Sequence, residues 1–150
     1  MEWKLNFRND GILEIKSNET SSIGDFKKLV EEVISDTRWN PGMNTISDLR
    51  DVDVKVVKQD DIYSVENIHK QYNNELGNGK IAAILDTDIG FGLGRTYEAI
   101  SSRNIKSSIM IFRNYEDGME WIQNKENRLL MLWKFRLRKI FLKEGIVKSV

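Results

Sequence analysis

The chain contains no cysteine and a single histidine, His69, and these absences remove several classes of site. Without cysteine there is no disulfide framework, thiolate zinc site, iron–sulfur cluster or cysteine nucleophile, and a reducing compartment is permitted. One histidine excludes a multi-histidine metal site and leaves His69 as the only residue that could serve a catalytic triad. We therefore expect a fold stabilised by its hydrophobic core, without a cofactor or a bound metal.

Long apolar runs and a secretory signal are also absent. No run approaches the roughly 18 residues of a membrane span, and Met1 is followed by the charged residues Glu2 and Lys4. The sequence therefore predicts a cytoplasmic protein. With 150 residues, of which 40% are hydrophobic, the chain is long enough for one ordinary domain.

The net charge is zero, but the two signs are separated along the chain. Residues 1–124 hold 15 Lys and Arg against 21 Asp and Glu, whereas residues 125–150 hold 8 against 2. This division predicts an acidic domain over residues 1–124 and a basic amphipathic extension over residues 125–150. An acidic body argues against a nucleic-acid-binding groove on the domain, because such grooves attract phosphates with Lys and Arg.

Hydrophobic alternation predicts an antiparallel hairpin at the start of the chain. Trp3, Leu5 and Phe7 alternate with polar residues, as in a half-buried strand. The following Asn9-Asp10-Gly11 predicts a type I′ turn, and residues 12–15 supply the returning strand.

The rest of the domain shows helical and strand patterns in turn. Residues 23–34 and 62–76 have helical spacing, with N-caps expected at Ser21 or Ser22 and at Asp60. Further strands are expected over residues 45–48, 80–86 and 108–112, and further helices over residues 95–102 and 115–123, while residues 49–61 fit a strand or a loop. The order β-β-α-β-α-β-α-β-α describes an α/β fold with one open mixed sheet and amphipathic helices packed on it.

A glycine-rich stretch, residues 90–94, lies between a predicted strand and a predicted helix. Phosphate-binding loops occur at such places because a helix N-terminus offers unpaired N–H groups. The spacing lacks both the third glycine of a dinucleotide fingerprint and the Gly-Lys-Ser/Thr of a P-loop. Two interpretations stay open: glycines that let a helix approach the sheet, and a small-anion site formed by Gly92, Gly94 and Arg95.

Two other patterns suggest metal binding, but each lacks residues that such a metal site requires. Glu66 and His69 have the Glu-x-x-His spacing of a carboxylate metal site, but such a site needs a second copy. The aspartates between residues 48 and 61 lack the pattern of a calcium loop. We expect no metal site.

Charged side chains at the predicted strand ends are the better candidates for ligand binding. Open α/β sheets bind ligands at the carboxyl ends of their strands, and Asp48, Arg50 and Asp86 occupy such ends. An enzyme would require Asp48 and Asp86 to converge near Arg50 and Arg95. The candidate ligand-binding residues are therefore Asp48, Arg50, Asp86, Gly92, Gly94 and Arg95.

The basic extension contains an unusually apolar segment, residues 129–142. As a helix it would form a basic amphipathic element that packs on its own domain, pairs with a partner, or lies on an anionic membrane surface. All three interpretations stay open, and residues 134–137 also alternate as a strand would. The residues expected to form the interaction surface are Leu130, Trp133, Leu137, Arg138, Ile140 and Phe141.

Several motifs, in order, resemble one known family. They are the opening hairpin, the Trp39-Asn40-Pro41-Gly42 turn before residues 46–50, the strand 81–85 followed by residues 91–98, and residues 111–122. Across residues 1–122 the chain resembles the SpoIIAA-like family. This family is related to the STAS anti-sigma-factor antagonists and shares a topology with CRAL-TRIO lipid-binding domains.

The resemblance implies a STAS-like sheet, no known catalytic machinery, and a role in protein association or small-ligand binding. One departure matters for regulation. True antagonists have an Asp-Ser-Ser-Gly phosphoacceptor loop after the strand that corresponds to residues 45–48, whereas residues 51–61 contain no serine. A phosphorylation switch of that kind is therefore not expected.

The function we predict is a non-enzymatic, STAS-like interaction or regulatory module that forms a homodimer or binds a protein partner. The alternative is a module of CRAL-TRIO-like type that binds a small ligand, a lipid or an anion and associates with a membrane surface through the basic extension. Neither hypothesis involves nucleic acid.

Overall fold

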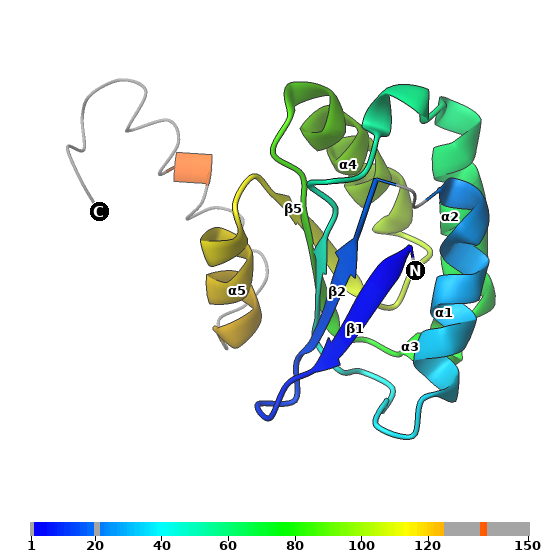
Figure 1. Ribbon diagram of the computed structural model, residues 1–150, viewed down its shortest axis with the longest axis vertical. Coiled ribbons are helices and arrows are strands. Elements are labelled where there is room, and N and C mark those ends of the chain that lie inside the picture. Colours follow the sequence, from blue (N-terminus) through cyan, green and yellow to red (C-terminus); the bar gives the residue numbers. More distant parts are fainter. Residues whose placement is uncertain (1, 20–21, 125–135, 138–150) are drawn as a thin grey trace.

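A five-stranded sheet forms the centre of the molecule and carries helices on both faces (Figure 1). The computed structural model describes residues 2–19, 22–124 and 136–137. The strands follow one another in space as in the sequence: β1 (Trp3–Phe7), β2 (Leu13–Ser17), β3 (Thr45–Asp48), β4 (Lys80–Ile84) and β5 (Ser108–Phe112). β1 is antiparallel to β2, and every later pair is parallel. The predicted open mixed sheet is confirmed.

The helices divide between the two faces. α1 (Phe26–Ser35), α2 (Gln59–Gln71) and α4 (Asp88–Ser101) cover one face, and α5 (Tyr115–Gln123) covers the other (Figure 1). Three short helices complete the fold: η1 (Ile23–Asp25), η2 (Val54–Val56) and α3 (Asn73–Leu76). Residues 49–58, which the sequence left open, thus form a loop with one 3-10 turn.

The opening hairpin is confirmed, but its turn is not type I′. Gly11 has a φ of 80°, and no residue other than glycine has a positive φ in the part of the chain described. The Gly11 N–H donates to the Arg8 carbonyl oxygen at 3.2 Å, and the Arg8 N–H donates to the Ile12 carbonyl oxygen at 2.9 Å. The connection is a four-residue turn followed by a glycine bulge, in which only the glycine needs a left-handed backbone.

The two predicted N-caps differ in outcome. Ser22 is the N-cap residue of η1, which leads directly into α1, but its Oγ donates to the Asp25 Oδ2 at 2.7 Å instead of accepting a backbone N–H; Ser21 lies outside the described residues. The cap predicted at Asp60 is wrong. α2 begins before Asp60, and the N–H of Lys58 donates to the Asp61 carboxylate at 2.7 Å. The helix also stops at Gln71, and α3 is a separate turn.

α4 begins at Asp88 instead of Arg95, so the glycine-rich stretch is helical and not a loop. The Thr87 side chain caps the helix by accepting the Gly90 N–H at 3.1 Å. Arg95 therefore lies about two turns inside the helix, and the first turn carries the acidic Asp88. An anion site at a helix start beside Arg95 loses its geometric basis, because an acidic first turn disfavours anions.

The face covered by α5 is a closed hydrophobic core. Trp121 is 0% exposed and packs against Phe112, with 5.7 Å between the ring centroids. Ile46 and Ile84 belong to the same cluster. At the end of α5, the Lys80 Nζ donates to the Trp121 carbonyl oxygen at 3.0 Å, so the last turn of the helix is tied to β4.

The other face is packed unevenly. α4 lies directly on β5, α1 packs through Val33 against Leu13 and Ile15 of β2, and α2 packs on α1, η1 and α4. Glycine permits the close approach of α4, because a Cβ at Gly94 would lie 2.9 Å from side-chain atoms of both Ile111 and Leu85. Space is left between α1, α2 and the sheet.

The basic extension is mostly outside the described residues. Of its predicted interaction residues only Leu137 is described; it is helical, together with Arg136. Leu130, Trp133, Arg138, Ile140 and Phe141 fall outside, so the role of this segment stays a prediction. Among the helices that are described, none is both long and apolar enough to cross a membrane.

Two glycines in the same helix give a matched test of the close packing of α4. Gly94→Ala should lower the free energy of unfolding, since overpacking a core costs about 1–3 kcal/mol. A Cβ at Gly92 would meet no atom within 4 Å, so Gly92→Ala should raise the free energy of unfolding by about 0.5–1 kcal/mol. Urea denaturation of both variants measures the difference, and equal stabilisation by both would contradict the packing.

Candidate functional site

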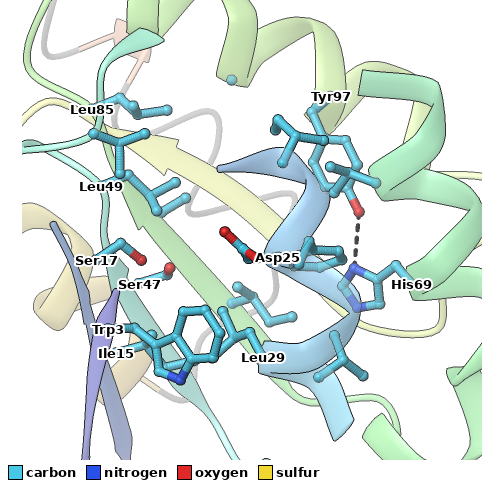
Figure 2. Close-up of a pocket in the computed structure, with 18 of the residues that line it drawn as sticks. Trp3, Ile15, Ser17, Asp25, Leu29, Ser47, Leu49, His69, Leu85 and Tyr97 are labelled. Atoms are coloured by element: carbon cyan, nitrogen blue, oxygen red, sulfur yellow. Dashed lines mark hydrogen bonds between the residues drawn. The ribbon is translucent and has the colours of Figure 1, made fainter. Parts of the chain in front are cut away.

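A cavity of about 680 Å³ lies between the sheet and the helices α1, α2 and α4 (Figure 2). Its walls are mostly apolar. They include Ile15 from the sheet, Leu29 and Val33 from α1, and Leu85 at the end of β4. A volume of this size is typical of small-molecule binding sites, which range over about 300–1,000 Å³.

The cavity exists because the middle of the sheet carries small side chains on this face. In the strand register Ser47 of β3 lies between Ile15 of β2 and Ala83 of β4, and Ser17 ends β2. Successive side chains of a strand point to opposite faces, so Ser47 faces the cavity while Ile46 faces α5. Larger residues at these positions would fill the space that α1 and α2 leave.

The sequence held a signal for this cavity that hydrophobic patterning did not reveal. Central strands of a parallel sheet are covered on both faces and are normally apolar throughout. Thr45 and Ser47 place two hydroxyl groups on one face of β3, which has a parallel neighbour on each side. A polar inward face at the centre of a sheet indicates either a buried polar network or a cavity.

His69 and Tyr97 form the polar pair on the helical wall of the cavity. The His69 Nδ1 lies 2.9 Å from the Tyr97 hydroxyl (Figure 2). His69 is 4% exposed, and burial lowers its pKa to about 4, so the ring is neutral at pH 7. Burial likewise raises the pKa of Tyr97. We assign the tautomer in which the Tyr97 hydroxyl donates to Nδ1, since this hydroxyl has no other acceptor among the described residues.

A second polar group lies on the other side of the cavity. The hydroxyls of Ser17 and Ser47 point from the sheet into it, and the Asp25 carboxylate projects toward the same space from the start of α1 (Figure 2). The charged residues that line the cavity are all acidic: Glu19, Asp25, Asp53 and Asp61.

The structure brings three of the predicted candidates together, but outside the cavity. Asp48 accepts hydrogen bonds from the Arg50 Nη2 at 2.8 Å and from the Lys16 Nζ at 2.9 Å. Burial acts to raise the pKa of Asp48, yet these hydrogen bonds outweigh it and hold the pKa well below its usual range. Asp86 is exposed and helps to raise the pKa of Arg50, after the larger effect of Asp48. Lys16, Asp48 and Arg50 thus form an ion-pair network in which each charge has a partner.

The other candidates lie on α4 and do not join that network. Arg95 faces Glu98 with 3.7 Å between the charged atoms, Gly92 is exposed, and Gly94 alone of the predicted residues lines the cavity. In the described part of the chain no contact joins Arg95 to the Asp48 network. The convergence that an enzyme would require is therefore not observed.

The Glu-x-x-His pair is held by structural hydrogen bonds. Glu66 accepts one from the Asn104 side chain at 3.0 Å, while His69 is bonded to Tyr97. Within the ranges that the structure describes, no three His, Asp or Glu side chains gather closely enough to hold a metal ion.

The buried His69 predicts a pH dependence of stability. Its folded pKa of about 4 lies below the ordinary 6.5, so the unfolded chain binds a proton that the folded chain does not. Stability is therefore full above pH 6.5 and falls by about 3 kcal/mol toward pH 4.

His69→Gln should remove this dependence, because glutamine does not titrate. Urea denaturation between pH 4 and 8 checks it, with carboxylates contributing equally to both proteins. Identical slopes for wild type and variant in that window would contradict the assignment of a neutral, buried ring.

Comparisons with known proteins support the fold. No protein-family model and no curated protein matches the chain. Among solved structures it is similar to an uncharacterised protein of the DUF3478 family from Shewanella loihica PV-4, described as having a SpoIIAA-like fold. The TM-score is 0.52 and the identity 12%, and the match covers 80% of this chain and 91% of that one. The chain has the SpoIIAA-like fold that its motifs predicted.

Proposed function

We propose that this protein binds a small, largely hydrophobic molecule in the cavity between the sheet and α1, α2 and α4. The observation that carries the proposal is the size of an apolar space inside a small domain, about 680 Å³. Protein interiors are normally close-packed, with few voids larger than a water molecule. A hydrophobic ligand in this space would remove the apolar lining from contact with water.

The surroundings of the cavity suit a binding site. One wall is the sheet, which is fixed from behind by the α5 core, and the other is formed by α1 and α2. At the packing density of protein interiors, a ligand of about 500 Å³ would fill the space. A few polar groups in a mainly apolar lining are what small-molecule sites use to orient a ligand.

This proposal takes up the ligand-binding alternative of the two functions that the sequence suggested. The cavity supports binding, and the proposal includes no chemical step. The association hypothesis depends on residues 125–150 and stays a prediction, as does a cytoplasmic location.

A cavity-filling variant tests the proposal. Nile red, an uncharged dye that fluoresces in apolar surroundings, should bind the wild-type protein at micromolar concentrations. Ser47→Leu should weaken that binding at least tenfold, because the new side chain occupies the cavity. It should also stabilise the protein by about 1–2 kcal/mol, since an apolar side chain is buried.

Ser64→Leu is the matched control, because Ser64 is exposed on α2. It should leave both dye binding and stability nearly unchanged. Native mass spectrometry of the full-length protein as purified would show a retained ligand directly. Absence of dye binding by the wild type, or equal effects of the two variants, would overturn the proposal.

A further inference from the structure

We infer that the ligand is an amphiphile whose polar end donates hydrogen bonds and carries no negative charge. An ammonium group is the best match for this polar end, which lies against Asp25, Ser17 and Ser47. The inference rests on the proposed function and adds the chemical class of the ligand. It is carried by the charge and hydrogen-bonding capacity of the groups that line the cavity.

The lining of the cavity carries negative charge. Four carboxylates line the cavity, and neither Lys nor Arg is found among the lining residues that the structure describes. Two of the four already accept backbone hydrogen bonds: Asp61 from the Lys58 N–H at 2.7 Å and Asp53 from the Lys55 N–H at 3.1 Å. All four still contribute negative potential, which repels an anionic head group and attracts a cation.

Asp25 is the carboxylate best placed to contact a ligand. It occupies the N-cap position of α1, where Asp usually accepts a backbone N–H, but it makes no such cap. Its side chain is 18% exposed and lines the cavity. The Ser22 hydroxyl donates to one carboxylate oxygen and holds the pKa of Asp25 below its usual value, so the group is ionised at pH 7.

The charge of Asp25 is not fully compensated by its neighbours. The Lys28 Nζ lies 3.6 Å away, but that side chain is 75% exposed and its charge is screened by water. Desolvation, and after it a hydrogen bond with Asp25 and the charge of Asp25, raise the pKa of Glu2. A ligand cation beside Asp25 would add to the partial compensation that Lys28 supplies.

Two hydroxyls complete the polar end of the cavity. Ser17 is 4% exposed, and its hydroxyl points into the cavity together with that of Ser47 (Figure 2). In the described part of the chain, neither hydroxyl makes a hydrogen bond to another residue. Both hydroxyls are therefore available to accept hydrogen bonds, and a ligand head group with N–H or O–H groups would donate to them as well as to Asp25.

His69 does not compete for the polar end. Its Nε2 is buried and has no partner among the described residues, yet it presents almost no accessible surface to the cavity. The hydrocarbon part of the ligand would therefore lie along Leu29, Val33 and the helical wall, and its head group would lie toward Asp25.

Three probes with the same ten-carbon chain test the inference: decylammonium, 1-decanol and decanoate, each displacing Nile red at pH 7. In the wild type we expect affinity to fall in that order, with decylammonium at least tenfold tighter than decanoate. Asp25→Asn should weaken decylammonium about tenfold, strengthen decanoate, and change 1-decanol less than threefold. Ser17→Ala should weaken decylammonium and 1-decanol severalfold, and it provides a second variant if Asp25→Asn fails to fold.

Glu120→Gln is the matched control, because it removes the same charge from an exposed position on α5, across the sheet. It should leave the order and the ratios unchanged. If all three probes bind but decanoate binds best, or if Asp25→Asn leaves the ratios unchanged, the inference is wrong while the proposed function stands. If neither Nile red nor any probe binds, the proposed function itself fails and the inference with it.

Discussion

The difference between the two faces of one sheet determines the rest of the structure. On the α5 face, large apolar side chains such as Ile46, Phe112 and Trp121 fill the space between sheet and helix. On the other face, Ser47 and Ala83 occupy the centre, while α1 packs on the β1–β2 side of the sheet through Val33. Since close packing is the normal condition of a protein interior, the space on this face is the feature on which the proposed ligand binding rests.

The closely packed α5 face holds in place the sheet that forms one wall of the cavity. A cavity keeps its shape only if the surrounding structure cannot collapse into it, and here the sheet is anchored from behind. The α5 core, the Lys80 contact with the end of that helix and the Asp48 network all lie on the side of the sheet away from the cavity or at its edge. Asp48 and Arg50 are held in charge-assisted hydrogen bonds with each other and with Lys16, which tie the ends of β2 and β3 together.

Much of the fold could be predicted because it depends on local pattern. Alternation and periodicity located the hairpin, the strands and α5, and the single proline with Gly42 marked the turn before β3. The predicted start of α4 was wrong because glycine indicates a loop only on average; here Thr87 caps the helix, and Gly94 is needed for contact with Ile111. Hydrophobic patterning could not predict the cavity, because it shows which side chains face inward but not whether side chains from opposite walls touch; only the hydroxyls of Thr45 and Ser47 in a central strand gave a signal.

Function therefore has to be argued from the site, because a fold shared at 12% identity specifies an architecture and no ligand. The sequence suggested an anion near Arg95, on the assumption that a helix began there. The structure removes that helix start and presents instead a cavity lined by carboxylates and hydroxyls. Charge decides between the two, since carboxylates in an apolar space disfavour another anion far more strongly than a distant arginine could favour it. The acidic balance of residues 1–124, which argues against a nucleic-acid-binding groove, points the same way for the small molecule that we propose.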